Sequence, residues 1–211
     1  PEVIDLLVES AQFLIEKGEA TKARQRLTEA ITRNPDDPNL YRLRAKACTP
    51  MFLDQAKQDL TYGIRLYEAA RAADLSPVTN VSVAELYDLR GSVCHLLGQL
   101  EESAADYITA SETDGRVIDY WIHSGSAKLA NCEFEAAVVD LEAALVLDAE
   151  SYDARYMLYQ AYMGDDQYAA AKAQLDWLIG DQRTESRDSQ TRLRLYKHRA
   201  ICSARLSGAQ D

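Results

Sequence analysis

The chain has 211 residues, 47% of them hydrophobic, and a formal net charge of −11. This acidity disfavours general nucleic-acid binding, which relies on Lys and Arg at phosphates, and it disfavours an anionic membrane surface. It favours solubility and basic partners. The sequence shows no signal peptide and no apolar run long enough to span a membrane.

The first predicted element is a pair of amphipathic helices over residues 4–37. Gly18 makes the turn between them, because a left-handed helix cap costs glycine little. Pro35 ends the second helix, since proline cannot continue one. The expected core positions are Leu7, Ala11 and Leu14, followed by Ala23, Leu27, Ala30 and Ile31.

A second pair begins at Pro38 and differs from the first in two places. Thr49-Pro50 breaks its first helix early. Its second helix has no stop signal and is predicted to continue through Ala73, before a loop over 74–80. Its core positions are Tyr41, Ala45 and Cys48, followed by Ala56, Leu60, Gly63 and Ile64.

Three further pairs begin near residues 84, 118 and 152. The five starts are therefore separated by 34, 46, 34 and 34 residues, a period typical of a stacked helix–turn–helix solenoid with one insertion. The expected core positions of these three pairs are Tyr87, Gly91, Cys94, Leu100, Ser103, Tyr107 and Ala110; Trp121, Gly125, Lys128, Phe134, Ala137, Leu141, Ala144 and Leu145; and Arg155, Tyr159, Tyr162, Tyr168, Ala171, Leu175, Leu178 and Ile179.

The last predicted element is a helix over about 189–206, after a polar linker over 181–188. Its apolar residues are Leu195, Tyr196, Ala200 and Ile201, placed among basic residues. A polar outer face suits the capping helix that a solenoid needs at its end. We expect one elongated domain over 1–211, with sub-blocks at 1–73 (two repeats), 74–83 (linker loop), 84–185 (three repeats) and 186–211 (capping helix and tail).

With several units in register, the chain resembles a tetratricopeptide-repeat protein over nearly its whole length. The residues that carry the resemblance are Leu7, Ala11, Leu14, Gly18, Ala23, Leu27, Ala30 and Pro35 in the first unit, and Trp121, Gly125, Phe134, Ala137, Leu141 and Ala144 in the fourth. Departures are Lys128 and Ala149 in the fourth unit, at the places of a tyrosine and a proline. In the fifth, Tyr159 and Leu178 stand at small-residue positions, so altered packing is expected there. The resemblance implies an all-α, right-handed superhelical solenoid of antiparallel helix pairs, with about five units and a C-terminal capping helix.

The resemblance also implies a concave groove, lined by the first helices, that binds an extended peptide or a helix of a partner. Groove-facing residues are expected one position beyond each core stripe. The candidates are Asp5, Glu9, Gln12, Arg42, Lys46, Glu85, Asp88, Ser92, His95, Asp119, Ile122, His123, Ser126, Asp153, Tyr156 and Gln160. The set is acidic at both ends, which favours a partner segment that carries Lys or Arg. A solvated acidic face is the alternative, because carboxylates are also favoured in the first turns of helices.

A subclass of the family resembles a clamp for the C-terminal carboxylates of heat-shock chaperones, built from Lys, Asn and Arg. The matching places here hold Asp5, Glu9, Lys46, Glu85 and Asp88. Carboxylates repel a carboxylate ligand, so that clamp is not expected, although Arg42 and Lys46 leave a local exception.

No sequence motif for chemistry is present: there is no Gly-rich phosphate loop, HExxH or GxSxG. His95 and His123 would need further ligands, such as Asp88, Asp119 or Glu85, to hold a metal. We expect no enzyme activity, metal or cofactor. The four cysteines are widely spaced, as in buried free thiols of a reducing, cytoplasmic compartment. The chain begins with Pro1 rather than Met, as in an excised fragment whose native termini are missing.

The leading hypothesis is a protein–protein interaction scaffold or adaptor, similar to a co-chaperone, with a groove for a partner segment. Two alternatives remain open. One is self-assembly, in which an exposed end of the stack joins another copy. The other is a non-catalytic arm of a larger protein, such as an enzyme or a J-domain co-chaperone.

Overall fold

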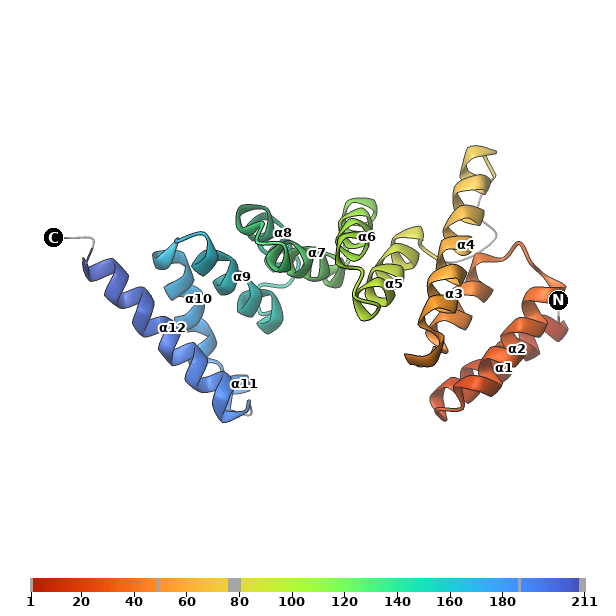
Figure 1. Cartoon of the computed structure of the whole chain (residues 1–211), viewed down its shortest axis with the longest axis horizontal. Coiled ribbons are helices and arrows are strands. Elements are labelled where there is room, and N and C mark those ends of the chain that lie inside the picture. The colour runs from red at the N-terminus through yellow and green to blue at the C-terminus, as the bar shows by residue number, and fades with distance from the viewer. Residues whose placement is uncertain (1, 49, 76–80, 186, 209–211) are drawn as a thin grey trace. The chain divides into compact units, whose positions relative to one another are not determined.

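The computed structural model describes residues 2–48, 50–75, 81–185 and 187–208. These residues form twelve α-helices and one 3₁₀ turn, with no strand among them. Consecutive helices pair in an antiparallel manner (Figure 1). The predicted all-α solenoid of five helix pairs and a C-terminal helix is confirmed. The contacts divide the chain into two compact units, residues 1–113 and 114–211. The single domain with its sub-blocks stays a prediction.

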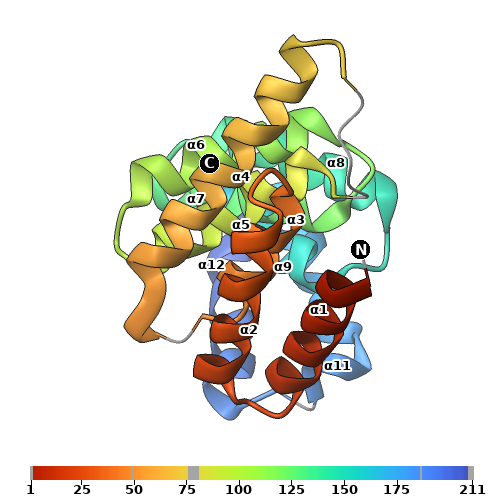
Figure 2. The same cartoon turned by 90° about the vertical axis from the view of Figure 1, so that its right-hand side faces the viewer.

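The first unit holds three helix pairs, α1/α2, α3/α4 and α5/α6. Their bounds are α1 Glu2–Glu16, α2 Ala20–Arg33, α3 Pro38–Lys46, η1 Pro50–Phe52, α4 Leu53–Ala72, α5 Val83–Leu96 and α6 Leu100–Thr113. Figure 2 shows α1 and α2 side by side, and α4 longer than its neighbours. The long α4 agrees with the missing stop signal. The predicted loop over 74–80 lies outside the described residues from 76 onward.

The core of the first unit follows the predicted stripes. Ala11, Ala23 and Leu27 pack with residues of α3, and Ala56, Leu60 and Ile64 pack with Ala45 and Leu86. Leu100 is an exception, because it lies at the start of α6 and is 48% exposed.

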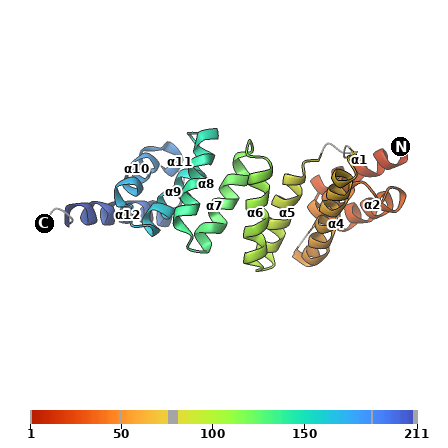
Figure 3. The same cartoon turned by 90° about the horizontal axis from the view of Figure 1, so that it is seen from above.

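The second unit holds two more pairs, α7/α8 and α9/α10, and two C-terminal helices. The bounds are α7 Ile118–Ala130, α8 Phe134–Leu147, α9 Tyr152–Gly164, α10 Tyr168–Gly180, α11 Gln182–Glu185 and α12 Ser189–Gly208. Figure 3 gives a second view of these pairs. The predicted starts at 118 and 152 coincide with the first residues of α7 and α9.

The predicted linker over 181–188 is wrong in part, because it contains the short helix α11. The Asp181 side chain accepts a hydrogen bond from the backbone N–H of Arg183 at 2.7 Å, which caps this turn. Thr184 is buried, and its hydroxyl lies 3.1 Å from that of Tyr152. These contacts fold α11 against α9.

The turns inside four of the five pairs use one backbone conformation. Gly18, Gly98, Cys132 and Asp166 all have φ between 56° and 75°. They stand at the same place in their repeats, 14 residues after the predicted start. Glycine adopts this left-handed region at little cost, whereas Cys132 and Asp166 adopt it with strain.

Buried ion pairs join the two helices of the three middle pairs. Arg44 binds Asp59 through two hydrogen bonds of 2.6 and 2.9 Å, and Arg90 binds Asp106 in the same way at 2.7 and 2.8 Å. In α7/α8, Lys128 lies 2.7 Å from Asp140, which also accepts a hydrogen bond from the buried Ser124 hydroxyl. Lys128 is therefore part of a buried contact rather than a packing defect.

Helix α12 packs on α10 and buries two of its side chains fully. Leu195 and Cys202 are fully buried, whereas Tyr196 is 52% and Ile201 44% exposed. Of the apolar residues that the sequence places on this helix, Leu195 is buried and Tyr196, Ala200 and Ile201 are exposed, so the predicted polar outer face is not wholly polar. The reason is geometric: Leu195 and Cys202 are seven residues apart and share one side of the helix, while the other apolar residues lie beyond that side.

Candidate partner-binding faces

The candidate residues of α1 lie on the surface of the first unit. Asp5, Glu9 and Gln12 are all exposed. Asp5 and Glu9 belong to a helix with no basic residue, so α1 presents negative charge to solvent. The arrangement can attract a cation.

The candidate residues of α3 and α5 meet in one charged cluster. Glu85 of α5 accepts hydrogen bonds from Arg42 and Lys46 of α3, each at 2.7 Å. Asn39 holds the Arg42 guanidinium in place at 2.8 and 3.1 Å. Burial raises the pKa of Glu85, but the bonds from Lys46 and the charge of Arg42 outweigh it and leave the pKa lowered. Glu85 is therefore ionised, and its two cationic partners leave this cluster with no net negative charge.

Farther along α5, the candidates differ in exposure. His95 is exposed, whereas Asp88 and Ser92 are half-buried. The Ser92 hydroxyl accepts a hydrogen bond from the Tyr107 hydroxyl of α6 at 3.2 Å. Ser92 thus supports the packing of its own helix pair.

In the second unit, α7 and α9 pack against each other and carry the remaining candidates. Asp119 and Asp153 are exposed in the first turns of these two helices. Asp153 lies 3.7 Å from Arg187, a long and exposed ion pair. Ile122, His123 and Ser126 of α7 are half-buried. This face combines two surface carboxylates with partly covered apolar and imidazole groups.

Tyr156 belongs to an aromatic cluster and is half-buried. Its ring stacks on Tyr152 at 6.3 Å and meets Tyr159 edge-on at 5.2 Å. Its hydroxyl accepts a hydrogen bond from Arg194 of α12 at 3.3 Å. The Gln160 side chain donates to the Tyr156 backbone oxygen at 3.1 Å. The C-terminal helix therefore contributes to this face, which was not expected from the sequence.

The sequence reasoning missed the buried ion pairs and the role of Arg194. The ion pairs do have a signal, because an aspartate recurs near the middle of the second helix at 59, 106 and 140. Arg194 has none, since its contact depends on how α12 docks. Among the described residues no cluster of three or more His, Cys, Asp and Glu could hold a metal ion, and none of the helices described is long and apolar enough to cross a membrane.

The chain is similar to several solved structures across most of its length. A MamA protein is 13% identical, with 88% of this chain and 94% of that chain covered and a TM-score of 0.71. The C-terminal part of a TPR repeat-containing protein from Cytophaga hutchinsonii is 17% identical, with 96% and 72% covered and a TM-score of 0.69. YrrB, described as a TPR protein with an unusual peptide-binding site, is 17% identical, with 90% of each chain covered and a TM-score of 0.63.

Neither protein-family models nor curated protein sequences give a match. Because the sequence identities are 13% and 17%, the similarity to these proteins is one of fold. Together with the 34-residue period and the observed helix pairs, it shows that this chain has the fold of the tetratricopeptide-repeat proteins.

Proposed function

We propose that this protein is a non-catalytic interaction module that binds a basic peptide or helix of a partner protein along the faces of its first helices. One observation carries the proposal: four carboxylates of these faces, Asp5, Glu9, Asp119 and Asp153, are exposed. Exposed acidic groups attract a segment that carries Lys or Arg, and they add more to specificity and association rate than to affinity. The peptide-binding site named for YrrB is a precedent on the same fold.

The face of α7 and α9 is the better place for the test than Glu85, because Glu85 holds both Arg42 and Lys46. Reversing Glu85 would place three cations together and destabilise the first unit. Asp119 and Asp153 do not stabilise the fold in this way. The test variant is therefore Asp119→Asn combined with Asp153→Asn.

The probe is a labelled peptide of alternating Lys and Leu, compared with one of alternating Glu and Leu. We expect the Lys peptide to bind and its affinity to fall with salt. Each exposed charge contributes about 0.2–1 kcal/mol, so the double variant should bind about two- to thirty-fold more weakly. Fluorescence anisotropy measures the affinity, and circular dichroism should show an unchanged melting midpoint.

The matched control is Glu133→Gln combined with Glu135→Gln, which removes the same charge at the start of the second helix α8. This control should bind the Lys peptide as the native chain does. Equal binding of both peptides, or equal weakening by test and control variants, would overturn the proposal.

A further inference from the structure

The first and last described helices carry opposite charge. Helix α1 has four acidic residues and no basic one, whereas α12 has five basic residues and no acidic one. Among the described α-helices, α12 and the shorter α3 are the two that contain no carboxylate. Charge of this kind, separated by helix, points to contacts between unlike surfaces.

The outer side of α1 combines this negative charge with exposed apolar groups. Glu2, Leu6, Glu9, Phe13 and Glu16 follow one another at intervals of four and three residues, so they share one side of the helix. Leu6 is 64% and Phe13 58% exposed. The opposite side holds the fully buried Ala11. We call these five residues the acidic face.

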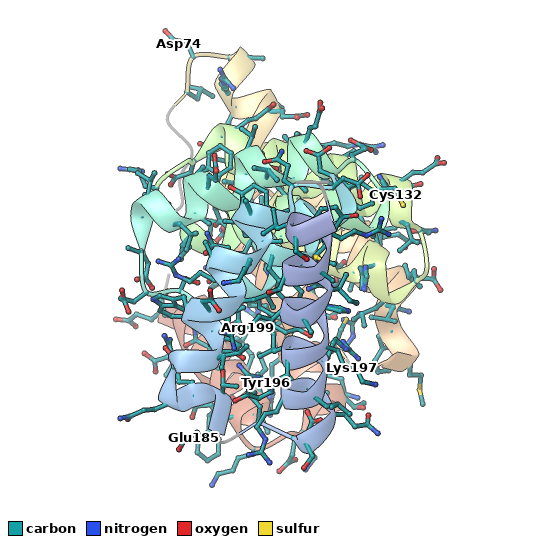
Figure 4. All side chains as sticks on the ribbon, turned by 90° about the vertical axis from the view of Figure 1, so that its left-hand side faces the viewer. Asp74, Cys132, Glu185, Tyr196, Lys197 and Arg199 are labelled. Atoms are coloured by element: carbon teal, nitrogen blue, oxygen red, sulfur yellow. The ribbon has the colours of Figure 1, made fainter. Side chains whose placement is uncertain are left out.

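The outer side of α12 presents apolar and small residues with one cation, Lys197, among them. Leu193, Lys197, Ala200 and Ala204 form a line opposite the buried Leu195 and Cys202. Tyr196 flanks this line and is 52% exposed, like Leu193 at 53%. Figure 4 shows α12 facing the viewer, with Tyr196, Lys197 and Arg199 labelled. We call Leu193, Tyr196, Lys197, Ala200 and Ala204 the basic face.

Three of the five cations on α12 already have partners in the second unit. Arg199 forms an ion pair with Asp176 of α10 at 2.6 Å, Arg194 bonds the Tyr156 hydroxyl, and the Arg205 guanidinium lies over the Tyr168 ring at 5.7 Å. Arg192 and Lys197 are exposed. Lys197 is the cation on the basic face itself, and Arg192 and Arg205 lie on the flanks of the helix.

We propose that the acidic face of one copy of this protein docks on the basic face of a second copy. Leu6 and Phe13 would leave water against Leu193 and Tyr196, and the small Ala200 and Ala204 let the helices approach closely. Pairing of two α12 helices, or of two α1 helices, would place like charges together and is disfavoured. Because the two faces differ, the contact is heterologous, and each copy that joins leaves one free face of each kind.

This interaction goes beyond the proposed function, because the basic face takes no part in the first-helix surface. Glu9 alone belongs to both. A partner peptide could therefore bind α7 and α9 while two copies associate through α1 and α12, and the two activities can fail separately.

Charge reversal and mixing test the contact. One variant carries Glu2→Lys, Glu9→Lys and Glu16→Lys, and a second carries Arg192→Glu, Lys197→Glu and Arg205→Glu. The average mass is measured by light scattering over a wide concentration range. The native chain should rise above the mass of one chain, continue past that of two, and fall back when salt is added. Each variant alone should stay nearer to the mass of one chain, because both of its faces then carry the same charge.

An equimolar mixture of the two variants restores opposite charges across the contact, so its mass should rise again. A control with Glu101→Lys, Glu112→Lys and Glu135→Lys changes the same charge elsewhere and should associate as the native chain does. Circular dichroism establishes that all variants are folded. A native mass of one chain at every concentration, or association that neither reversal weakens, would overturn the proposal. So would a mixture that does not recover. The Lys peptide test at α7 and α9 is unaffected by any of these results.

Discussion

In the three middle helix pairs a cation meets a buried aspartate, whereas the last pair, α9/α10, has no carboxylate at the corresponding place. Leu158 stands where Arg44, Arg90 and Ser124 stand in their repeats, and it is 1% exposed. Gln174 stands at the place of Asp106 and Asp140, and this neutral amide accepts a hydrogen bond from Arg155 at 2.8 Å. One fold thus accommodates a joint with a buried ion pair and a joint built from an apolar side chain and a neutral amide.

The comparison shows what each joint, meaning the contact between the two helices of a pair, depends on. A buried ion pair tolerates the loss of both partners far better than the loss of one, because the survivor remains charged in a dry site. An apolar joint depends on shape and volume instead. The last pair also has α12 packed on α10.

The largest effect is expected from breaking one middle joint. Asp140→Ala leaves Lys128 without its partner at a site where the Lys128 side chain is only 15% exposed. The free energy of unfolding should fall by about 3–5 kcal/mol. Chemical denaturation followed by circular dichroism measures it.

Two companion variants sharpen this result. Lys128→Met combined with Asp140→Leu removes both charges and should cost less than Asp140→Ala, the remaining loss coming from the buried Ser124 hydroxyl, which no longer has its acceptor. Asp176→Ala removes an exposed carboxylate that binds Lys172 and Arg199, and it should cost about 1 kcal/mol or less. If Asp140→Ala lowers the free energy of unfolding no more than Asp176→Ala does, the buried ion pair of α7/α8 contributes no more to stability than an exposed one.

A smaller loss is expected from crowding a close crossing of two helices, α7 and α8. A Cβ atom at Gly125 would lie 2.7 Å from the Leu141 side chain, so Gly125→Trp forces the α7/α8 crossing apart. Overpacking of this kind costs about 1–3 kcal/mol. In the last pair the same position holds Tyr159, which is fully buried, so this repeat accepts a large residue there.

The control for this variant is Gly180→Trp, because nothing lies within 4 Å of a Cβ at Gly180. Thermal melting of both variants separates crowding from the general cost of a tryptophan. A Gly125→Trp chain that melts with the native one would show that the register of α7 on α8 is wrong.

The repeat architecture could be read from the sequence because it depends on local spacing. The starts expected at 38, 118 and 152 are the first residues of α3, α7 and α9. Small residues such as Ala11 and Gly125 stand where two helices cross closely, and their spacing from the large residues is local in the sequence.

The joints and faces could not be read in the same way. Lys128 departs from the family pattern, and only the three-dimensional position of Asp140 explains it. Glu85 has the composition of a groove residue, yet Arg42 and Lys46 neutralise it from a neighbouring helix. Contacts between side chains distant in sequence depend on packing angles, which the period does not specify.

The smallest expected effect is a fall in the free energy of unfolding at low pH. It arises at the last helix pair rather than at the middle ones. His198 of α12 lies against Tyr159, with ring centroids 5.7 Å apart, and its buried Nδ1 atom has no hydrogen-bond partner among the described residues. Burial, together with the charge of Arg194, lowers the pKa of His198 below its usual 6.5. The unfolded chain therefore takes up a proton below pH 6.5 that the folded chain resists.

The free energy of unfolding should consequently contain a term from His198 that is full above pH 6.5 and declines as the pH falls below that value. Melting midpoints at about pH 7.5 and about pH 5.5 bracket the change. His198→Gln should show a smaller loss on acidification than the native chain, whereas His95→Gln, at an exposed site on α5, should show the native loss. If His198→Gln loses as much as the native chain does, the docking of α12 on α9 does not depend on a neutral imidazole. The acid sensitivity of the native chain would then come from groups other than His198.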